Sequence, residues 1–239
     1  MPSHSAIVTG ASRGIGRAIA EALGADGYAL TLTARKPEGL LDTANELAAK
    51  GYEVRQLAAN VADEAAIAEV VALHRERHGR LDVLVNNAGL GVGAAAGDHA
   101  TKSVDLQLAV NLRAIVLFYR ESLELLRVAG AEHHRAQVVN LASITGKSPA
   151  PWLSVYSATK AGVIAYTQAM NKELNGDGIR SVALCPGFVD TDMTEFVRGS
   201  VPPEQMIRPD DIAAAVRFVL SLSPNAVVPE IVFERPAAN

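Results

Sequence analysis

Short apolar runs alternate with longer segments of helical period along the whole chain. The runs are mostly continuous in polarity, which is typical of parallel strands that helices cover on both faces. The expected strands are Ser5–Thr9, Ala29–Thr33, Glu53–Leu57, Val83–Asn86, Gln137–Leu141, Arg180–Leu184 and Val227–Phe233. The expected helices are Gly14–Leu23, Leu40–Ala49, Glu64–His78, Thr101–Val128, Ser154–Asn175 and Asp210–Leu220. This order predicts an α/β fold, a doubly wound parallel sheet of about seven strands with helices on both faces.

The chain has 239 residues, a length that allows one large α/β domain or two small ones. No linker, repeat or low-complexity tract divides it, so we predict a single domain over residues 1–239. Residues 188–208 form the least regular stretch, rich in Thr, Gly and Pro, and follow an expected strand. Because ligands bind at the carboxyl ends of the strands in such sheets, we expect this stretch to be a substrate-binding lid.

The formal charge of −4 lacks the overall positive field that attracts polyanions, so we expect no nucleic acid partner. No apolar run approaches the roughly 18–20 residues of a membrane-spanning helix, and the first residues do not have the pattern of a signal peptide. We therefore expect a cytoplasmic protein without a membrane partner. The single cysteine, Cys185, excludes an intrachain disulfide and a Cys-rich zinc site. His74 and His78 are four residues apart on an expected helix, but no third ligand accompanies them, so we predict no metal site.

A glycine-rich turn follows the first expected strand and opens the first expected helix. Gly10, Gly14 and Gly16 have the spacing Gly-x-x-x-Gly-x-Gly. Glycines allow a tight turn and a close approach of the backbone to a pyrophosphate, and the helix N-terminus supplies free N–H groups and a positive dipole end. The turn therefore predicts a dinucleotide site.

Further motifs come in a fixed order after this turn. Asn86-Asn87-Ala88-Gly89 ends the fourth strand, Asn111 lies on the next helix, Ser143 ends the fifth strand, Tyr156-x-x-x-Lys160 lies on the helix after it, and Pro186-Gly187 with Thr191 follows the sixth. Together these motifs resemble the short-chain dehydrogenase/reductase family over nearly the whole chain, in particular its NADP(H)-dependent 3-oxoacyl-[acyl-carrier-protein] reductases. The resemblance implies a Rossmann-type sheet. It also implies a set of cofactor-binding residues: Gly10, Ser12, Arg13, Gly14, Ile15, Gly16, Arg35, Asn60, Val61, Asn87, Ala88, Gly89, Tyr156, Lys160, Pro186, Gly187, Val189 and Thr191.

The end of the second strand favours NADP(H) over NAD(H). Ala34 offers no carboxylate for the adenosine ribose, whereas Arg35 offers a planar fork for a 2′-phosphate, and Arg13 in the glycine-rich turn is placed to reach the same group. Asn60 stands where the family usually has an aspartate against the adenine, and its amide oxygen can still accept a hydrogen bond there.

Tyr156 and Lys160 are four residues apart and share one helix face. A nearby ammonium stabilises a phenolate, so we expect a lowered pKa for Tyr156, which would exchange a proton with a carbonyl or alcohol oxygen. By resemblance, Lys160 also holds the nicotinamide ribose, Ser143 hydrogen-bonds the substrate oxygen, and Asn111 supports a water-linked proton path. These four residues are the predicted catalytic set.

The expected substrate pocket is apolar and suits an alkyl or aryl ketone, a 3-oxoacyl chain, or a small terpenoid or steroid. Its candidate lining is Leu90, Val92, Ile144, Trp152, Leu153, Phe188, Met193, Phe196, Val197 and Met206. An acidic carrier protein would need a basic rim. The candidates for that rim are His133, His134, Arg135 and Lys172.

The leading interpretation is an NADP(H)-dependent oxidoreductase that transfers hydride between nicotinamide and a carbonyl or secondary alcohol. An alternative is a non-catalytic NADP(H)-binding regulatory protein on the same fold. A sugar-nucleotide epimerase or dehydratase of the related extended family would have another glycine spacing and a longer C-terminal substrate domain. The C-terminal stretch from Val228 to Pro236 lacks the glycine-rich ending of the acyl reductases, and we expect a homo-oligomer, either a dimer or a tetramer.

Overall fold

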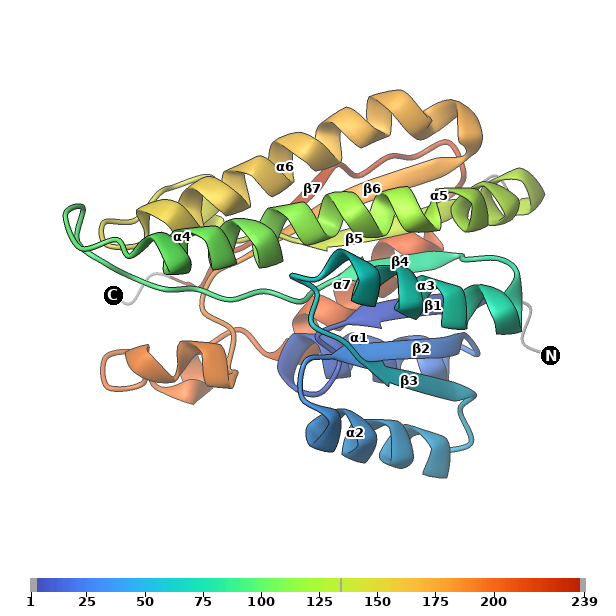
Figure 1. Ribbon diagram of the computed structural model, residues 1–239, viewed down its shortest axis with the longest axis horizontal. Coiled ribbons are helices and arrows are strands. Elements are labelled where there is room, and N and C mark those ends of the chain that lie inside the picture. The colour runs from blue at the N-terminus through green and yellow to red at the C-terminus, as the bar shows by residue number, and fades with distance from the viewer. Residues whose placement is uncertain (1–3, 134, 237–239) are drawn as a thin grey trace.

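A parallel sheet of seven strands forms the centre of the molecule, in the order β3-β2-β1-β4-β5-β6-β7 (Figure 1). The computed structural model describes residues 4–133 and 135–236. The strands are β1 (Ser5–Thr9), β2 (Ala29–Ala34), β3 (Val54–Ala58), β4 (Val83–Asn86), β5 (Ala136–Leu141), β6 (Ile179–Pro186) and β7 (Glu230–Phe233). Every pair of neighbouring strands is parallel, which confirms the predicted doubly wound fold.

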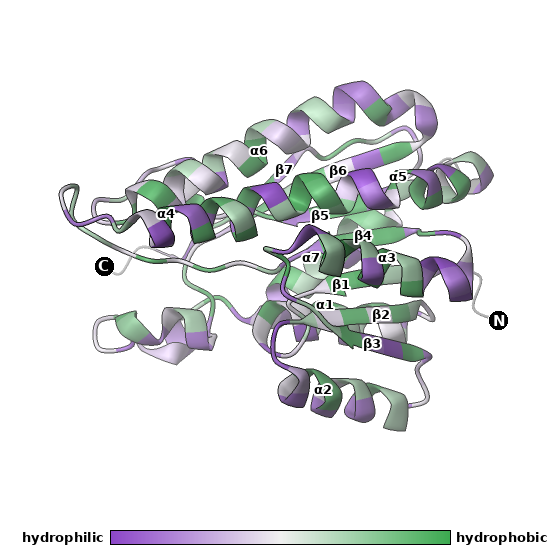
Figure 2. Ribbon diagram, in the orientation of Figure 1, coloured by the Kyte–Doolittle hydropathy of each residue, from purple (hydrophilic) through white to green (hydrophobic). Residues whose placement is uncertain are grey.

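Helices cover both faces of this sheet. They are α1 (Gly14–Ala25), α2 (Pro37–Ala49), α3 (Glu64–His78), α4 (Thr101–Leu108), α5 (Ala114–His133), α6 (Ser154–Leu174) and α7 (Pro209–Ser221). One apolar core joins the sheet to α3, α5 and α6, and a second core joins it to α1, α2 and α7. Figure 2 shows the apolar strands between these two helical layers. Burial on both faces explains why most strands are continuous apolar runs.

The chain reverses its direction of winding between β1 and β4, which are neighbours in the sheet. The Thr9 hydroxyl oxygen at the end of β1 accepts the backbone N–H groups of Asn87 and Ala88 at 3.0 and 2.9 Å. Asn87 Nδ2 in turn donates to the carbonyl oxygens of Thr9 and Gly10 at 2.9 and 3.1 Å. These bonds join the loops after β1 and β4 at the switch point, where ligands bind in open α/β sheets.

The long helix expected over Thr101–Val128 is not continuous. Ala109–Arg113 forms a π-helical turn between α4 and α5, and the helix then runs on to His133. Asn111 lies within this turn, and its side chain bonds the backbone of Leu90 in the loop after β4. A π turn inside a helix often marks a functional position, and here it directs an amide group at the loop beside the switch point.

The last strand begins at Glu230, three residues later than expected. Pro229 has no N–H to donate to a neighbouring strand, although its carbonyl oxygen accepts Ala183 N at 3.0 Å. Just before it, the carbonyl oxygens of Ser223 and Ala226 each accept Arg180 Nη1 at 3.1 Å. The chain is therefore fixed by side-chain and turn contacts until the ladder with β6 begins.

Among residues 4–133 and 135–236, none of the helices combines the length and the apolar character that a membrane crossing requires.

Candidate active site

The glycine-rich turn brings backbone to backbone more closely than a side chain would permit. Gly10 has a positive φ of 65°, a conformation that L side chains rarely adopt. A Cβ on Gly16 would lie 2.3 Å from the Gly10 carbonyl oxygen. The N-cap residue of α1 is Arg13, whose guanidinium has no acceptor atom, and no side-chain cap bonds the first N–H groups of the helix. The turn therefore presents free donors at a helix N-terminus, as anion binding requires.

The two arginines predicted beside the adenosine end differ in the structure. Arg35 follows β2, is exposed, and has no hydrogen bond or ion pair among the described residues. Arg13 instead forms an ion pair with Asp192, from the segment after β6. We expected both cations to converge on one group, but the Arg13 guanidinium points to a carboxylate that is 179 residues away in the sequence.

Asn60 and Val61 lie between β3 and α3. The Asn60 side-chain oxygen accepts Ala62 N at 3.2 Å, so this oxygen stabilises its own turn. Val61 is buried in the core that contains α3. Ser12 lies in the glycine-rich turn, where its carbonyl oxygen accepts the Thr43 hydroxyl at 3.2 Å.

Asn111 is fully buried and uses both ends of its amide. Its Oδ1 accepts Leu90 N at 2.9 Å, and its Nδ2 donates to the Leu90 carbonyl oxygen at 2.8 Å and to Thr159 Oγ1 at 3.2 Å. A Cβ on Gly89 would lie 3.4 Å from Asn111 Oδ1 and 3.5 Å from Lys160 Nζ. Asn111 thus fixes the loop after β4 close to Lys160.

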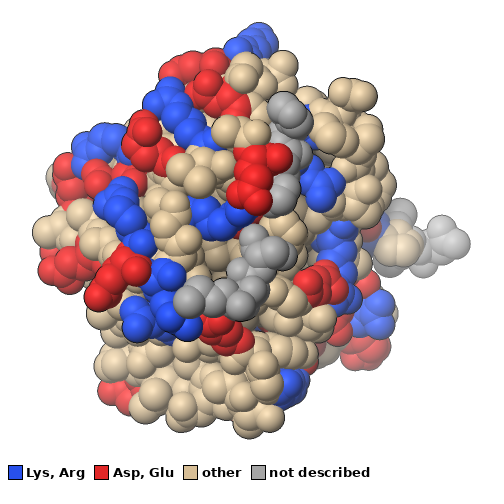
Figure 3. Space-filling model, turned by 90° about the vertical axis from the view of Figure 1, so that its right-hand side faces the viewer, with Lys and Arg blue, Asp and Glu red and all other residues tan. Residues whose placement is uncertain are grey.

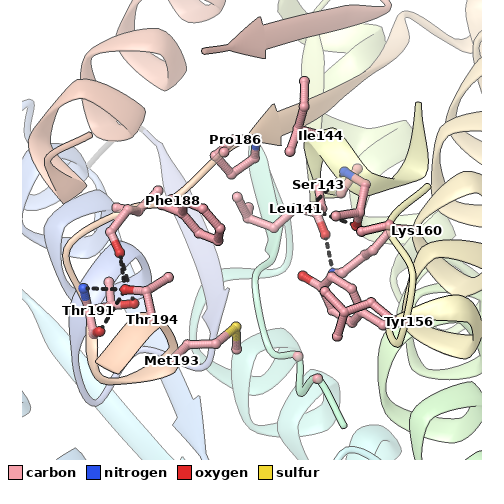
Figure 4. A pocket seen from close by; sticks show the side chains of 18 of the residues that line it. Leu141, Ser143, Ile144, Tyr156, Lys160, Pro186, Phe188, Thr191, Met193 and Thr194 are labelled. Carbon is pink, nitrogen blue, oxygen red and sulfur yellow. Dashed lines mark hydrogen bonds between the residues drawn. The ribbon is translucent and has the colours of Figure 1, made fainter. Parts of the chain in front are cut away.

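Ser143, Tyr156 and Lys160 lie together at the carboxyl ends of the strands, on one wall of a cavity (Figure 4). Ser143 follows β5, and its Oγ accepts Thr145 N at 3.2 Å and Thr145 Oγ1 at 3.1 Å. Lys160 Nζ lies 5.7 Å from the centroid of the Tyr156 ring and donates to the Leu141 carbonyl oxygen at 2.6 Å. The predicted spacing therefore places the phenol and the ammonium side by side on α6.

The pKa of Tyr156 departs from the expected direction. Burial raises the pKa of the phenol, and the hydrogen bond with Ser143 lowers it by less. Burial also lowers the pKa of Lys160 to about 8. Desolvation therefore sets the direction of the Tyr156 shift, and the phenol is protonated at neutral pH.

The segment after β6 forms the opposite wall (Figure 4). Gly187 N donates to the Phe233 carbonyl oxygen at 2.9 Å, which holds the end of β6 beside β7. The Val189 carbonyl oxygen accepts the hydroxyl groups of Thr191 and Thr194 at 3.4 and 2.5 Å. The methyl group of Thr191 packs against Gly14, so this segment contacts the glycine-rich turn.

A cavity of about 750 Å³ lies between these walls. Of the predicted site residues it is lined by Ile15, Asn87, Gly89, Ser143, Tyr156, Lys160, Pro186, Gly187, Val189 and Thr191. Outside its lining lie Gly10, Ser12, Arg13, Gly14, Gly16, Arg35, Asn60, Val61, Ala88 and Asn111. The sequence motifs therefore fall into two groups, one around the cavity and one extending from it along the glycine-rich turn and the ends of β2 and β3.

Eight of the ten residues expected to line the substrate pocket do line the cavity. The other two, Val197 and Met206, do not, and Met206 is buried with the Thr194 hydroxyl 3.8 Å from its sulfur. Glu234, Arg235 and Pro236 also line the cavity, although they were not predicted. The one sign of them in the sequence was that the chain lacks the family's usual glycine-rich ending. Only the tertiary fold brings the chain beyond β7 to this edge of the sheet.

The expected basic rim is at the wrong end of the sheet. Arg135 directly precedes β5, whereas Ser143 follows it, and its Nη1 donates to the Leu222 carbonyl oxygen at 2.5 Å. Lys172 lies near the last turn of α6, far along the helix from Tyr156. His134 and the side chain of His133 lie outside the described residues.

Cys185 is buried, and burial raises the pKa of its thiol to about 12, so the thiol is a packing group rather than a nucleophile. His74 is buried against Ser5 and Thr31. No group of three or more His, Cys, Asp or Glu side chains arranged for a metal ion occurs within the described ranges.

Three comparisons place the chain among known proteins. A family model described as short chain dehydrogenase matches residues 4–201. The granaticin polyketide synthase putative ketoacyl reductase 1 of Streptomyces violaceoruber is 40% identical over 195 residues, which is 81% of this chain and 70% of that protein.

Two solved structures are similar over almost their whole length. An alcohol dehydrogenase from the archaeon Thermococcus sibiricus, complexed with 5-hydroxy-NADP, is 33% identical with a TM-score of 0.86, over 98% of this chain and 99% of that one. A variant of actinorhodin polyketide ketoreductase with NADPH is 32% identical with a TM-score of 0.87, over 97% and 95% of the two chains. The match of the family model to most of the chain, together with these likenesses, shows that this protein belongs to the short chain dehydrogenase family.

Proposed function

We propose that the protein is an NADP(H)-dependent oxidoreductase that reduces a ketone or 3-oxoacyl group to a secondary alcohol, or runs the reverse reaction. The observation that carries the proposal is the position of Ser143, Tyr156 and Lys160 on one wall of a mainly apolar cavity, beside a glycine-rich turn at the same edge of the sheet. Proton donor, oxygen-binding hydroxyl and cation are thus gathered at one reacting centre.

The residues of the cavity edge fit a nicotinamide dinucleotide. The close approach of Gly16 to Gly10 makes the turn tight, and the start of α1 supplies backbone N–H donors for a pyrophosphate. Arg35, exposed and without an acidic partner among the described residues, would hold the 2′-phosphate, and no carboxylate at Ala34 opposes it. The NADP-type ligands of the two solved relatives support the same choice. When bound, NADPH supplies the hydride for the carbonyl carbon.

The chain's own residues supply the proton and bind the oxygen. Because burial keeps the Tyr156 phenol protonated, it donates its proton to the carbonyl oxygen as negative charge develops there. Ser143 Oγ accepts two hydrogen bonds from Thr145, and its own O–H, which faces Tyr156, would donate to the same oxygen. Lys160 uses one N–H on the Leu141 carbonyl oxygen, and its remaining donors suit the ribose hydroxyls. Asn111 acts as a positioning residue through Leu90.

Residues 188–208 are the proposed lid of a single catalytic domain. The segment contains two short 3₁₀ helices and extends away from the sheet in Figure 1, where it is orange. Phe188, Met193 and Phe196 come from it and line the cavity, and Phe196 is 64% exposed. A ligand that covered these side chains would remove them from water, which favours closure over an apolar substrate.

We also propose a homo-oligomer in the cytoplasm. Leu106, Leu108, Val116 and Val128 are exposed along α4 and α5, and covering such side chains favours self-association, as a dimer or a tetramer. A free cysteine thiol persists in a reducing compartment, which is consistent with a cytoplasmic location.

The test is a panel of ketones and 3-oxoacyl thioesters, with NADPH oxidation followed by absorbance. Turnover of at least one member supports the proposal. If the protein binds NADPH but converts none of the panel, the regulatory alternative is favoured. If it neither binds NADPH nor converts a substrate, the proposal fails.

A further inference from the structure

Arg235 lies just beyond β7 at the wall of the cavity. Its guanidinium carbon is 5.7 Å from the centroid of the Phe188 ring, close enough for a cation–π contact. In Figure 4 the Phe188 ring points into the space that faces Leu141 and Ser143. Arg235 is thus held by the aromatic wall of the cavity, outside residues 4–201, which the family model matches.

The strand geometry directs this arginine inward. Phe233 and Arg235 are half-buried while Glu234 between them is exposed, which is the alternation of an extended chain. The hydrogen bond from Gly187 N to the Phe233 carbonyl oxygen fixes the phase of that alternation. Arg235 therefore faces Phe188, while Glu234 is more exposed at the edge of the same cavity.

Arg235 differs from almost every other arginine of the chain. Fourteen arginines form an ion pair with a carboxylate or donate to a backbone carbonyl oxygen: Arg13, Arg17, Arg55, Arg75, Arg77, Arg80, Arg113, Arg120, Arg127, Arg135, Arg180, Arg198, Arg208 and Arg217. Within the described residues, Arg35 and Arg235 have neither kind of partner. Arg35 is assigned above to the 2′-phosphate, so Arg235 is the second arginine available for an anion.

The cavity has few charges to compete for such an anion. Its charged lining residues are Lys160, Glu234 and Arg235. Lys160 lies deep in the site on the Leu141 carbonyl oxygen, and Glu234 is an exposed residue at the cavity edge, more accessible to water than Arg235. A negative group on a ligand would therefore meet one uncommitted guanidinium beside an apolar wall, where partial desolvation strengthens a charge-assisted hydrogen bond.

Building on the proposed function, we propose that Arg235 determines substrate class by binding an anionic group carried by the ketone away from its reacting carbonyl. The carbonyl lies at Tyr156 and Ser143, the apolar body fills the cavity, and the anion reaches Arg235. A carboxylate on a small ketone and a phosphate on the pantetheine arm of a carried acyl chain share this chemistry.

The experiment compares matched probes with NADPH. One pair is 4-acetylbenzoate and its methyl ester, and the other is acetoacetyl-coenzyme A and acetoacetyl-N-acetylcysteamine. Arg235→Gln is expected to lower kcat/KM for the anionic member of a pair roughly ten- to a hundredfold, and that for the neutral member by less than about threefold. Arg235→Lys should recover part of the loss, because it restores the charge without the fork.

Two control variants isolate the charge effect. Glu234→Gln removes the carboxylate next to Arg235 at the cavity edge, and Arg55→Gln removes a surface arginine paired with Glu76. Neither should change the ratio between the probes in the direction of Arg235→Gln. A loss with the benzoate pair alone identifies a small carboxylate, and a loss with the thioester pair alone identifies the phosphate arm.

Equal losses for charged and neutral probes, or a wild-type enzyme that converts only neutral probes, would overturn the assignment of Arg235 while leaving the proposed function intact. Absence of turnover with every probe overturns the proposed function itself, and this inference with it.

Discussion

Both edges of the sheet carry buried polar side chains, but they use them differently. At the amino edge, where β1 and β4 begin, Asp82 accepts Ser5 N at 2.8 Å and Arg80 Nε at 3.0 Å. His74 contacts Ser5 Oγ at 3.2 Å, Thr31 Oγ1 at 2.8 Å and the Arg80 carbonyl oxygen at 2.9 Å. These groups bond one another, and none of them lines the cavity of the candidate active site.

At the carboxyl edge, the polar groups still have hydrogen-bonding capacity that the protein does not use. The hydroxyl groups of Ser143 and Tyr156 meet at the cavity, and Lys160 uses one of its N–H donors. Figure 3 views the molecule from the side where the N-terminus lies in Figure 1. Basic and acidic side chains are interleaved over this face. A buried polar cluster therefore indicates a site when its members still have bonding capacity beside a cavity, and indicates structure when they satisfy one another.

The largest effect is expected from Tyr156→Phe at the carboxyl edge. Loss of the proton donor should lower kcat roughly a thousandfold or more, while the Kd for NADPH changes little. The matched control is Tyr166→Phe on the same helix, whose ring packs edge-on against Tyr119. Steady-state kinetics and fluorescence titration would measure both quantities. Comparable activity of the two variants would remove Tyr156 from its assigned role.

The second prediction is that buried His74, at the amino edge, makes the protein less stable in acid. Burial, aided by His78, lowers the pKa of His74 from 6.5 to about 4, so the folded protein holds this side chain neutral where the unfolded chain binds a proton. The stability this confers is present above pH 6.5 and is lost as the pH falls through about 4. It amounts to about 3 kcal/mol in full, with roughly 2 kcal/mol lost between pH 7 and pH 5.

Urea unfolding at the two pH values measures this change. His74→Gln should flatten the dependence of the free energy of unfolding on pH, and the native protein alone provides the first test. His99→Gln, which changes a histidine bonded to Ser154 at the other end of the molecule, should leave the dependence in place. A native protein equally stable at pH 7 and pH 5 would contradict the claim that buried, neutral His74 makes the stability depend on pH.

The next largest effect is expected on cofactor binding when the charge at Arg35 is reversed. Arg35→Asp should weaken NADPH binding roughly ten- to a hundredfold more than NADH binding, because the 2′-phosphate loses a cation and meets a carboxylate. Arg55→Asp provides the same charge change at a surface ion pair on β3. Equal losses for the two cofactors, measured by titration, would place the 2′-phosphate elsewhere.

The smallest effect tests the pair between Arg13 and Asp192. Both side chains are exposed, so breaking the pair changes little by itself, but it frees a cation beside the glycine-rich turn. Asp192→Asn should tighten NADPH binding by roughly two- to fivefold. Asp190→Asn, which breaks the pair with Arg198 in the same segment, is the control. Weaker binding in Asp192→Asn would mean that the pair itself supports the site.

The sequence predicted the elements well because its strongest signals are local. Runs that are mostly apolar predicted the seven strands, and the spacing of Tyr156 and Lys160 placed two groups on one helix face. Contacts between distant segments left no such signal. The pair between Arg13 and Asp192 and the return of Arg235 to the cavity depend on how the chain beyond β6 and β7 folds back. The sign of the pKa shift of Tyr156 was missed because it depends on burial, which spacing does not report.

The π-helical turn at Ala109–Arg113 changes the phase of the side-chain pattern between α4 and α5. A π turn holds one residue more than an α turn, and each residue of an α-helix turns the next side chain by about 100°. The apolar stripe of α5 is therefore out of phase with the pattern of α4, and a single periodicity cannot describe both. Removing one residue from this turn would force a choice between the packing of Phe118 in the core and the bonds of Asn111 to Leu90. The extra residue lets the same helix serve the core and the site.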